Sequence, residues 1–176
     1  MPASTALLTP RRDPPLGREA HSLFSEGAVD VWLPQVGDAL GFLPELYPGG
    51  DLWLSRKIAD IRKERSRCLV AVAVAQQVLA GVAIETFKSP GVVKLSTFYV
   101  ETDSRRKGVG TAMLERLTGR WRVEGVRHAY VTVASTKAEE LEPLLLRHDF
   151  VCRTVHEGRY GMGRNEHVFD WRPFPR

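Results

Sequence analysis

The stretch DSRRKGVG, residues 103–110, decides the fold because it joins an apolar run to a helical pattern through a basic loop that contains two glycines. The apolar run before it, LSTFYV at residues 95–100, is typical of a buried strand. After Gly108 the apolar residues recur at steps of four, as Val109, Met113, Leu117 and Trp121. This change of period predicts a strand that ends at Val100 and a helix from Gly108 to about Glu124.

A loop of this kind at the start of a helix predicts an anion site. The first N–H groups of a helix have no partner within it, and the helix dipole favours negative charge there. Gly108 and Gly110 allow a ligand to approach the backbone closely. Arg105, Arg106 and Lys107 add positive charge beside them. The alternative interpretation is a solvated helix start with incidental charge.

Two well-known phosphate motifs do not fit this loop. The nucleotide P-loop needs two glycines separated by four residues, followed by Lys and then Ser or Thr, and this stretch lacks that pattern. The dinucleotide fingerprint needs a third glycine where Met113 stands and an acidic residue where Ser135 stands. We therefore exclude both motifs.

Further elements follow from apolar periodicity and turn residues on either side of this stretch. We expect a strand over 28–33, a helical segment over 33–47 that is interrupted at Pro44, a helix over 51–65, strands over 68–74, 78–87 and 92–100, and then a strand over 128–134, a helix over 137–148, and strands over 150–155 and 166–171. Pro143 within the later helix is expected only near its first turn. A glycine-rich hairpin loop is expected over 156–165. This order predicts an α/β (α+β) domain with a mixed sheet.

The composition is that of one folded domain with a substantial core: 176 residues, of which 43% are hydrophobic and 26% charged. The formal net charge of +4 arises from 25 basic and 21 acidic residues. This mild excess favours an anionic partner, and a small phosphorylated ligand satisfies it as well as nucleic acid does. No apolar run approaches the roughly 18 residues of a membrane span, and the N-terminus lacks the features of a signal peptide. We expect a cytoplasmic protein with no membrane partner.

The N-terminal segment and the cysteines give two further expectations. Residues 1–20 are rich in proline and poor in large apolar residues, so we expect a disordered or loosely attached tail before a single domain over residues 21–176. Cys68 and Cys152 share no metal-ligand spacing with the histidines. We interpret them as reduced, buried thiols, with one long-range disulfide as the alternative, and we expect no metal site.

The sequence RRKGVG at residues 105–110 resembles the signature of the GNAT-type (GCN5-related) acyl-CoA N-acyltransferases, which is Gln or Arg, two residues, Gly, one residue, and Gly or Ala. The runs KLSTFYV and HAYVTVA stand where this family has its fourth and fifth strands. The segment LLLRHDF stands where the family usually shows Phe-Tyr, three residues and Gly-Phe. The resemblance covers residues 68 to about 171, and the N-terminal helices only by their order.

The resemblance implies a GNAT fold, with a central, largely antiparallel sheet of about six to seven strands that is flanked by helices. In this family the fourth and fifth strands splay apart, and the cosubstrate, acetyl-CoA or a related thioester, occupies the gap. The resemblance assigns the pantetheine arm to Phe98, Tyr99 and Val100. It assigns the diphosphate to the following loop, which consists of Arg105, Arg106, Lys107, Gly108, Val109, Gly110 and Thr111.

The catalytic groups are less well defined. Members of this family often place a Glu near the cleft as a general base, and Glu85 is our first candidate, with Glu101 as the rival. The alternative for Glu85 is an edge carboxylate paired with Lys88 or Lys94. Leu145 stands where the family has a tyrosine acid, and Asp149 where it has a glycine. A substitute acid would come from Tyr99, Tyr130 or Tyr160, or the thiolate leaves without a protein acid.

We therefore expect an enzyme, an N-acyltransferase that moves an acyl group from acyl-CoA to a primary amine. The acceptor is not identified by the sequence, and a homodimer stays open. One alternative is a catalytically silent CoA-binding regulatory module. Another is an acetyltransferase that acts on a nucleic-acid-linked amine, whose binding would weaken steeply with salt.

Overall fold

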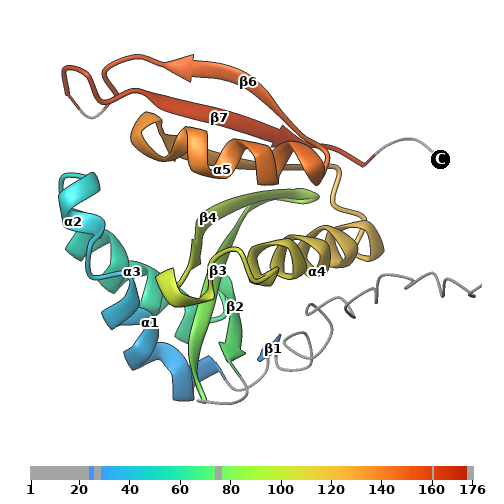
Figure 1. Ribbon diagram of the computed structural model, residues 1–176. Coiled ribbons are helices and arrows are strands. Elements are labelled where there is room, and N and C mark those ends of the chain that lie inside the picture. The colour runs from blue at the N-terminus through green and yellow to red at the C-terminus, as the bar shows by residue number, and fades with distance from the viewer. Residues whose placement is uncertain (1–23, 26–28, 74–76, 160, 174–176) are drawn as a thin grey trace, which may run out of the picture.

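A seven-stranded sheet forms the centre of the molecule, with the strand order β1-β2-β3-β4-β5-β7-β6 (Figure 1). The computed structural model describes residues 24–25, 29–73, 77–159 and 161–173. The strands are β1 (Phe24–Ser25), β2 (Ser66–Ala73), β3 (Val78–Ser89), β4 (Val92–Val100), β5 (His128–Ala134), β6 (Phe150–His156) and β7 (Glu166–Trp171). The β4–β5 pair is parallel and all the other pairs are antiparallel. The predicted mixed, largely antiparallel sheet is therefore confirmed.

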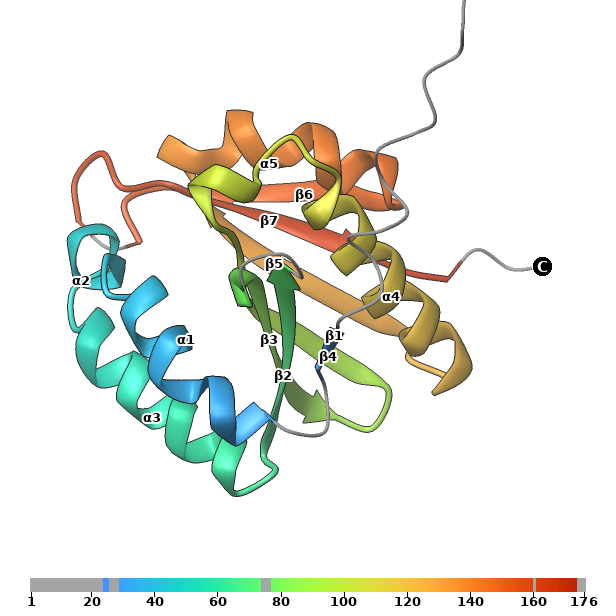
Figure 2. The ribbon, with the colours of Figure 1, turned by 60° about the horizontal axis from the view of Figure 1, so that its bottom comes forward.

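Helices cover both faces of the sheet (Figure 2). They are α1 (Leu33–Ala39), α2 (Leu43–Leu46), α3 (Gly50–Arg62), α4 (Val109–Val123) and α5 (Ser135–Arg147), with short 3₁₀ helices at Val29–Trp32 and Thr102–Ser104. Helices α1 and α3 pack on one face of β2 and β3, whereas α4 and α5 pack on the opposite face of the sheet.

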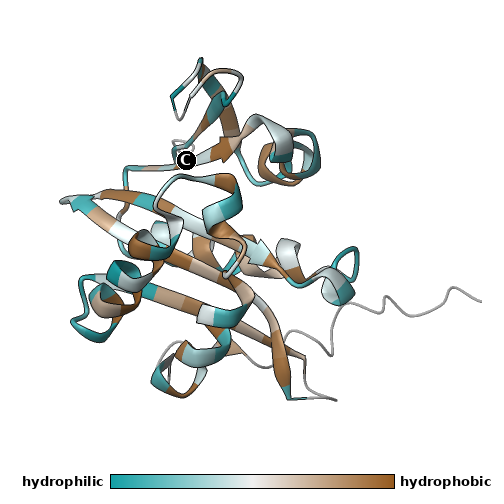
Figure 3. Cartoon of the chain, turned by 90° about the vertical axis from the view of Figure 1, so that its left-hand side faces the viewer, coloured by the Kyte–Doolittle hydropathy of each residue, from teal (hydrophilic) through white to brown (hydrophobic). Residues whose placement is uncertain are grey.

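The alternation of side chains along β2 shows how one strand supplies both cores. Cys68, Val70 and Val72 belong to the core under α1 and α3, whereas Leu69 and Ala71 belong to the core under α4 and α5. Successive strand residues point to opposite faces, so a strand buried on both sides reads as a continuous apolar run. In Figure 3 the apolar colour is correspondingly concentrated on the strands.

The first predicted strand, over 28–33, is wrong for the residues that the structure describes. Val29–Trp32 forms a 3₁₀ helix that leads into α1, and Val31 is exposed. Burial follows a helical spacing instead, at Leu33, Val36 and Leu40. Proline lies in the first turn of both α1 and α2, where a helix tolerates it, and Pro44 is the second residue of α2.

Pro143 also departs from expectation, because it lies well inside α5, which begins at Ser135. A proline there removes one backbone hydrogen bond of the helix. Pro143 is exposed, so its ring does not disturb the core, and the fully buried Leu145 anchors the same turn. Tertiary packing thus retains a helix that propensity alone would end.

Both cysteines are free, as expected, but Cys152 is only partly buried, contrary to the expectation of two buried thiols. Cys68 is buried, and this burial, with a smaller effect of the Glu85 charge, raises the pKa of its thiol to about 12. The predicted tail over residues 1–20 lies outside the described residues. In the described part of the chain no helix has the length and apolar character needed to cross a membrane.

Candidate active site

A cleft opens where β4 and β5 separate. These two strands pair from Val92–Leu95 to His128–Val131, and beyond this point β5 continues alongside β7 while β4 continues alongside β3. The cavity between them has a volume of about 670 Å³. It is lined by residues 42–43 and 45–47 from the α1–α2 region, 96–100 from β4, 105–106, 108 and 110–111 from the loop and α4, 131–134 from β5, and 137, 140–141, 144 and 147 from α5. The predicted splay of the fourth and fifth strands is therefore present.

The edge of β4 that faces the cleft carries backbone groups that are not used in the β4–β5 ladder. Thr97 to Val100 pair on their other side with Ile84 to Gly81 of β3. Ser96 is the extra residue of a β-bulge, since Thr97 pairs with Ile84 and Leu95 with Glu85. A strand with one open edge can hydrogen-bond an extended ligand through alternate N–H and C=O groups.

The N-terminus of α4 forms the polar end of this cleft. Gly108 is the residue before the helix and has a φ of +83°, a left-handed conformation that glycine adopts without strain. Helical geometry leaves the first N–H groups, from Val109 onward, without carbonyl partners, and the first intrahelical bond is that of Ala112 to the Gly108 carbonyl. Arg105 and Arg106 line the cleft beside them. This end is suited to bind a phosphorylated group.

The absence of a side chain at Gly110 keeps the cleft open at this point. A Cβ atom built there would lie 3.1 Å from Cδ2 of Leu144, 3.5 Å from Cγ2 of Val100 and 3.8 Å from Cε1 of Phe98. All three neighbours line the cleft. A longer side chain at residue 110 would therefore compete with a ligand for space.

Arg105 connects the two walls of the cleft. Its Nε donates to the carbonyl oxygen of Val100 at 3.1 Å, and its Nη1 donates to Oε1 of Glu140 on α5 at 3.0 Å. Lys137 lies 3.7 Å from the other carboxylate oxygen of Glu140. These contacts join the end of β4 to α5 across the cleft.

Most of the predicted CoA-contacting residues come together here. Those that line the cleft are Phe98, Tyr99, Val100, Arg105, Arg106, Gly108, Gly110 and Thr111. Lys107 and Val109 lie in the same loop and first helical turn but are not among the lining residues.

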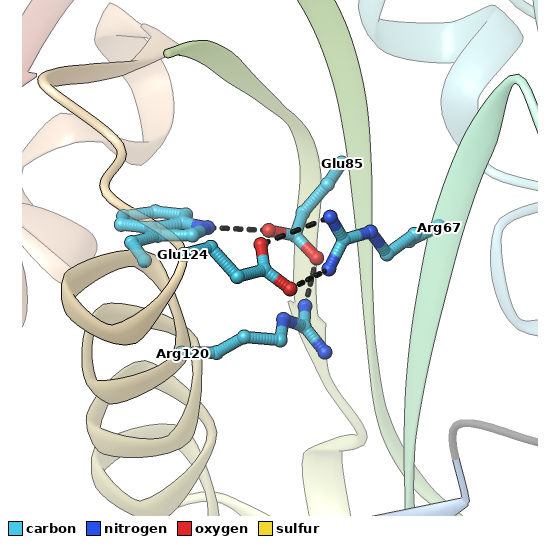
Figure 4. A network of polar contacts seen from close by, with 5 residues as sticks. Arg67, Glu85, Arg120 and Glu124 are labelled. Carbon is cyan, nitrogen blue, oxygen red and sulfur yellow. Dashed lines mark hydrogen bonds and ion pairs between the residues drawn. The ribbon is translucent and has the colours of Figure 1, made fainter.

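Glu85 lies elsewhere. Its side chain is 1% exposed and faces α4, where Arg120 and the indole N–H of Trp121 donate to its two carboxylate oxygens (Figure 4). Arg67 and Glu124 form a second ion pair beside them, with Nη2 of Arg67 donating to Oε2 of Glu124 at 2.9 Å. Burial raises the pKa of Glu85, while the positive charge of Arg120 and the hydrogen bond from Trp121 oppose this shift. Glu85 does not line the cleft, so its position does not support a role as the general base.

The structure also shows where the other acid–base candidates lie. Glu101 caps the 3₁₀ helix that follows β4, and Leu145 is fully buried in the core. Tyr130 stacks on His128, with ring centroids 5.7 Å apart, and Tyr160 lies outside the described residues. Tyr99 does line the cleft, with its ring 5.3 Å from that of Phe42, and burial together with the nearby Glu101 carboxylate raises its pKa. Its hydroxyl therefore stays protonated near neutral pH.

Several cleft residues were not predicted from the sequence. Phe42, Glu45 and Tyr47 come from the α1–α2 region, which the sequence described only as interrupted helix. Ser96 enters the cleft through the β-bulge, and no residue pattern signals that bulge.

This chain belongs to the GNAT acetyltransferase family, because the family's sequence model matches residues 36–148, more than half of its length. It is accordingly an acetyltransferase of a family that uses acyl-CoA. None of the curated proteins is similar enough in sequence to this chain to count as a match.

Solved structures of this family share the fold. A GNAT-family protein from Desulfovibrio desulfuricans superposes with a TM-score of 0.69 at 16% identity, covering 85% of this chain and 98% of that one. The aminoglycoside 6'-N-acetyltransferase from Enterococcus faecium gives a TM-score of 0.67 at 16% identity, with 88% and 98% coverage. An acetyltransferase from Bacillus subtilis in complex with CoA gives 0.58 at 18% identity, with 78% and 93% coverage. At these identities the likeness establishes the fold alone.

Proposed function

We propose that this acetyltransferase moves an acetyl or related acyl group from acyl-CoA directly to a primary amine. The observation that carries the proposal is the single cleft that combines an open strand edge at residues 96–100 with the N-terminus of α4 and two arginines. An extended amide-containing chain with a diphosphate at one end matches both parts.

The residues of this chain fit acyl-CoA as a cosubstrate. The backbone of Phe98, Tyr99 and Val100 would bind the pantetheine arm along the open edge of β4. The diphosphate would bind to the backbone N–H groups of the first helical turn, to which Val109 contributes its backbone, and to the charges of Arg105, Arg106 and Lys107. When bound, the thioester supplies an acyl carbon that is already activated for attack.

The transfer needs few protein groups. The ammonium loses one proton to solvent and becomes a nucleophile; a C–N bond then forms, the C–S bond breaks, the electron pair leaves on sulfur, and the second proton released by the nitrogen ends on the thiolate to give a thiol. Glu45 lies on the α2 wall of the cleft, is exposed, and is accompanied by Phe42 and Tyr47. We assign to Glu45 the binding of the cationic acceptor amine, and we assign no proton transfer to Glu85.

The setting of the enzyme is part of the proposal. Two free thiols suit a reducing compartment, so we place the protein in the cytoplasm. Its partners would be acyl-CoA and the amine acceptor, and a homodimer is compatible with the fold.

Substitution of Gly110 tests the proposal. Gly110→Glu would put a side chain against Leu144, Val100 and Phe98 and a negative charge at the helix N-terminus, and we expect it to abolish CoA binding in calorimetry. Gly119→Glu is the matched control, because Gly119 is in the same helix and its Cβ position has open space. The Gly110→Gln variant separates size from charge. Wild-type CoA affinity in a folded Gly110→Glu protein would refute the assignment.

The acceptor requires a separate screen. Purified protein with acetyl-CoA would be assayed for thiol release with polyamines, amino acids, aminoglycosides, peptides and aminoacyl-tRNA. Release with none of these, despite CoA binding, would favour a CoA-binding module.

A further inference from the structure

A chain of hydrogen bonds links a lysine of α3 to a threonine of β3 and then to a serine of β4, at the point where β4 separates from β5. Nζ of Lys57 donates to Oγ1 of Thr86 at 2.9 Å, and Oγ1 of Thr86 lies 2.9 Å from Oγ of Ser96. Oγ of Ser66 lies 3.2 Å from the same Thr86 oxygen. Lys57 is also 3.5 Å from Asp60, and its side chain is only 13% exposed. The ammonium is thus held in place beneath the sheet.

Hydrogen-bond valence gives this chain a direction. Lys57 can only donate, so Thr86 accepts from it. Ser66 is 2% exposed, and within the described residues Thr86 is the partner of its hydroxyl, so the buried Ser66 hydrogen is satisfied by donating to Thr86. With both of its lone pairs used, Thr86 donates its own hydrogen to Ser96. The hydroxyl hydrogen of Ser96 is then left for an acceptor in the cleft, which Ser96 lines.

Ser96 occupies the place where the reactive end of the cosubstrate would lie. It directly follows the last β4–β5 pair, Leu95 with Val131. The distance from Val100, beside the diphosphate end, to Ser96 is four strand residues, or about 13 Å at roughly 3.3 Å per residue. An extended arm that starts at the α4 N-terminus and follows this edge therefore ends near Ser96.

We propose that the Ser96 hydroxyl donates a hydrogen bond to the carbonyl oxygen of the acyl thioester, and that Lys57 is a positioning residue that orients and polarises this hydroxyl through Thr86. This inference rests on the proposed acyl-CoA site. The carbonyl oxygen gains negative charge as the amine attacks, so a fixed donor at that oxygen stabilises the transition state more than the ground state. A charge at the start of a hydrogen-bond chain strengthens the bonds that follow it.

Substitutions along the chain test each link. We expect Ser96→Ala to lower kcat by about 10²–10³, as removal of an oxyanion donor does. We expect Thr86→Val and Lys57→Met to lower kcat by about 10–100-fold, the equivalent of one charge-assisted hydrogen bond. Thr86→Ser keeps the hydroxyl and should restore turnover. Lys63→Met, at the exposed end of the same helix, is the control for loss of a lysine.

The assay avoids the unknown acceptor by using hydroxylamine, a small nucleophile that is neutral near pH 7, with acetyl-CoA and a thiol-release readout. The KM for acetyl-CoA and the CoA affinity in calorimetry should stay unchanged. A second readout does not depend on turnover: the carbonyl stretching frequency of bound ¹³C-labelled acetyl-CoA should be lower in the wild type and in Thr86→Ser than in Ser96→Ala and Thr86→Val. Urea unfolding identifies any variant that has lost its fold.

The outcomes separate this inference from the proposed function. A wild-type protein that binds no CoA overturns both. A wild-type protein that binds CoA, together with folded Ser96→Ala and Thr86→Val variants that keep the wild-type kcat and carbonyl frequency, overturns only the role of Ser96 and Lys57.

Discussion

Replacing Glu85 by Gln distinguishes a structural carboxylate from a catalytic base. The substitution keeps the size of the side chain and an oxygen that can accept from the indole of Trp121. It removes the negative charge that faces Arg120, whose side chain is 15% exposed. We expect a large loss of stability and no specific loss of turnover in the protein that remains folded.

The magnitude follows from burial. Removing one partner of a buried ion pair typically costs about 3–5 kcal/mol, because the other charge is left uncompensated. Burial raises the pKa of Glu85, which means that the folded protein loses free energy by keeping this carboxylate charged. Glu85→Gln removes that unfavourable contribution as well as the ion pair, so we expect its net cost in stability to lie near the lower end of that range. A loss of about 3 kcal/mol, with a urea m-value of about 1–3 kcal/mol/M, lowers the unfolding midpoint by about 1–3 M. Glu85→Ala should cost more, because the Trp121 N–H also loses its acceptor.

Two further variants serve as controls. Glu124→Gln breaks the neighbouring pair with Arg67, whose side chains are 35% and 37% exposed, and should cost about 1 kcal/mol or less. The double variant Glu85→Gln/Arg120→Leu removes both buried charges, keeps an acceptor for the Trp121 N–H, and should recover much of the loss. Turnover would be measured at urea concentrations well below the unfolding midpoint of each variant, so that the protein in the assay is folded. A stable Glu85→Gln protein whose kcat/KM falls by about 10²–10⁴ with unchanged CoA affinity would refute this reasoning and support Glu85 as the base.

Two further positions give measurable effects. Leu145 is fully buried where the family has a tyrosine, so Leu145→Ala should lower stability by about 2–5 kcal/mol through a cavity, while turnover per folded molecule is retained; complete loss of turnover in a stable variant would contradict this. Burial lowers the pKa of Lys94, and Glu166 only partly opposes this, so the folded state holds the Lys94 proton less tightly than the unfolded chain does. Stability should therefore rise with pH between the lowered pKa and about 10.4. Lys94→Met should be more stable than the wild type at pH 7 in urea unfolding, with an advantage that shrinks toward pH 10.4, and an advantage that does not change with pH would contradict the assignment.

The fold was largely predictable from residue 66 onward because its strands and helices each carry a strong periodic signal. The run before Val100 and the stripe from Val109 to Trp121 become β4 and α4 almost to the residue. Prediction failed over residues 29–32, where four residues are too few to separate a strand from a helical turn. It also failed at Pro143, because packing of α5 outweighs the local cost of proline.

The candidate site was predictable only where contiguous sequence builds it. The β4–loop–α4 segment forms one wall by itself, so a local motif locates most of the predicted CoA contacts. Ser96 and Glu45 depend on a strand register and on the packing of α2, which bring together segments that are distant in sequence. That Glu85 faces α4 and does not line the cleft was not predictable for the same reason, since residue identity does not reveal which face of β3 a side chain occupies when both faces are buried.

The contacts of Arg105 show that the RRKGVG motif performs two tasks. Arg105 uses Nε on the carbonyl of Val100 and Nη1 on Glu140, so much of its hydrogen-bonding capacity holds β4 and α5 at a fixed separation. Arg106 has a φ of +58° and an exposed side chain, and it adds positive charge at the cleft. Among the described contacts, the hydrogen bonds to Val100 and Glu140 belong to Arg105. Gly108 then turns the chain so that the α4 N–H groups face the same opening. The first residue of the motif therefore joins the two walls of the cleft and the later ones form its proposed anion site, which accounts for an arginine, with several donors in one rigid plane, at position 105.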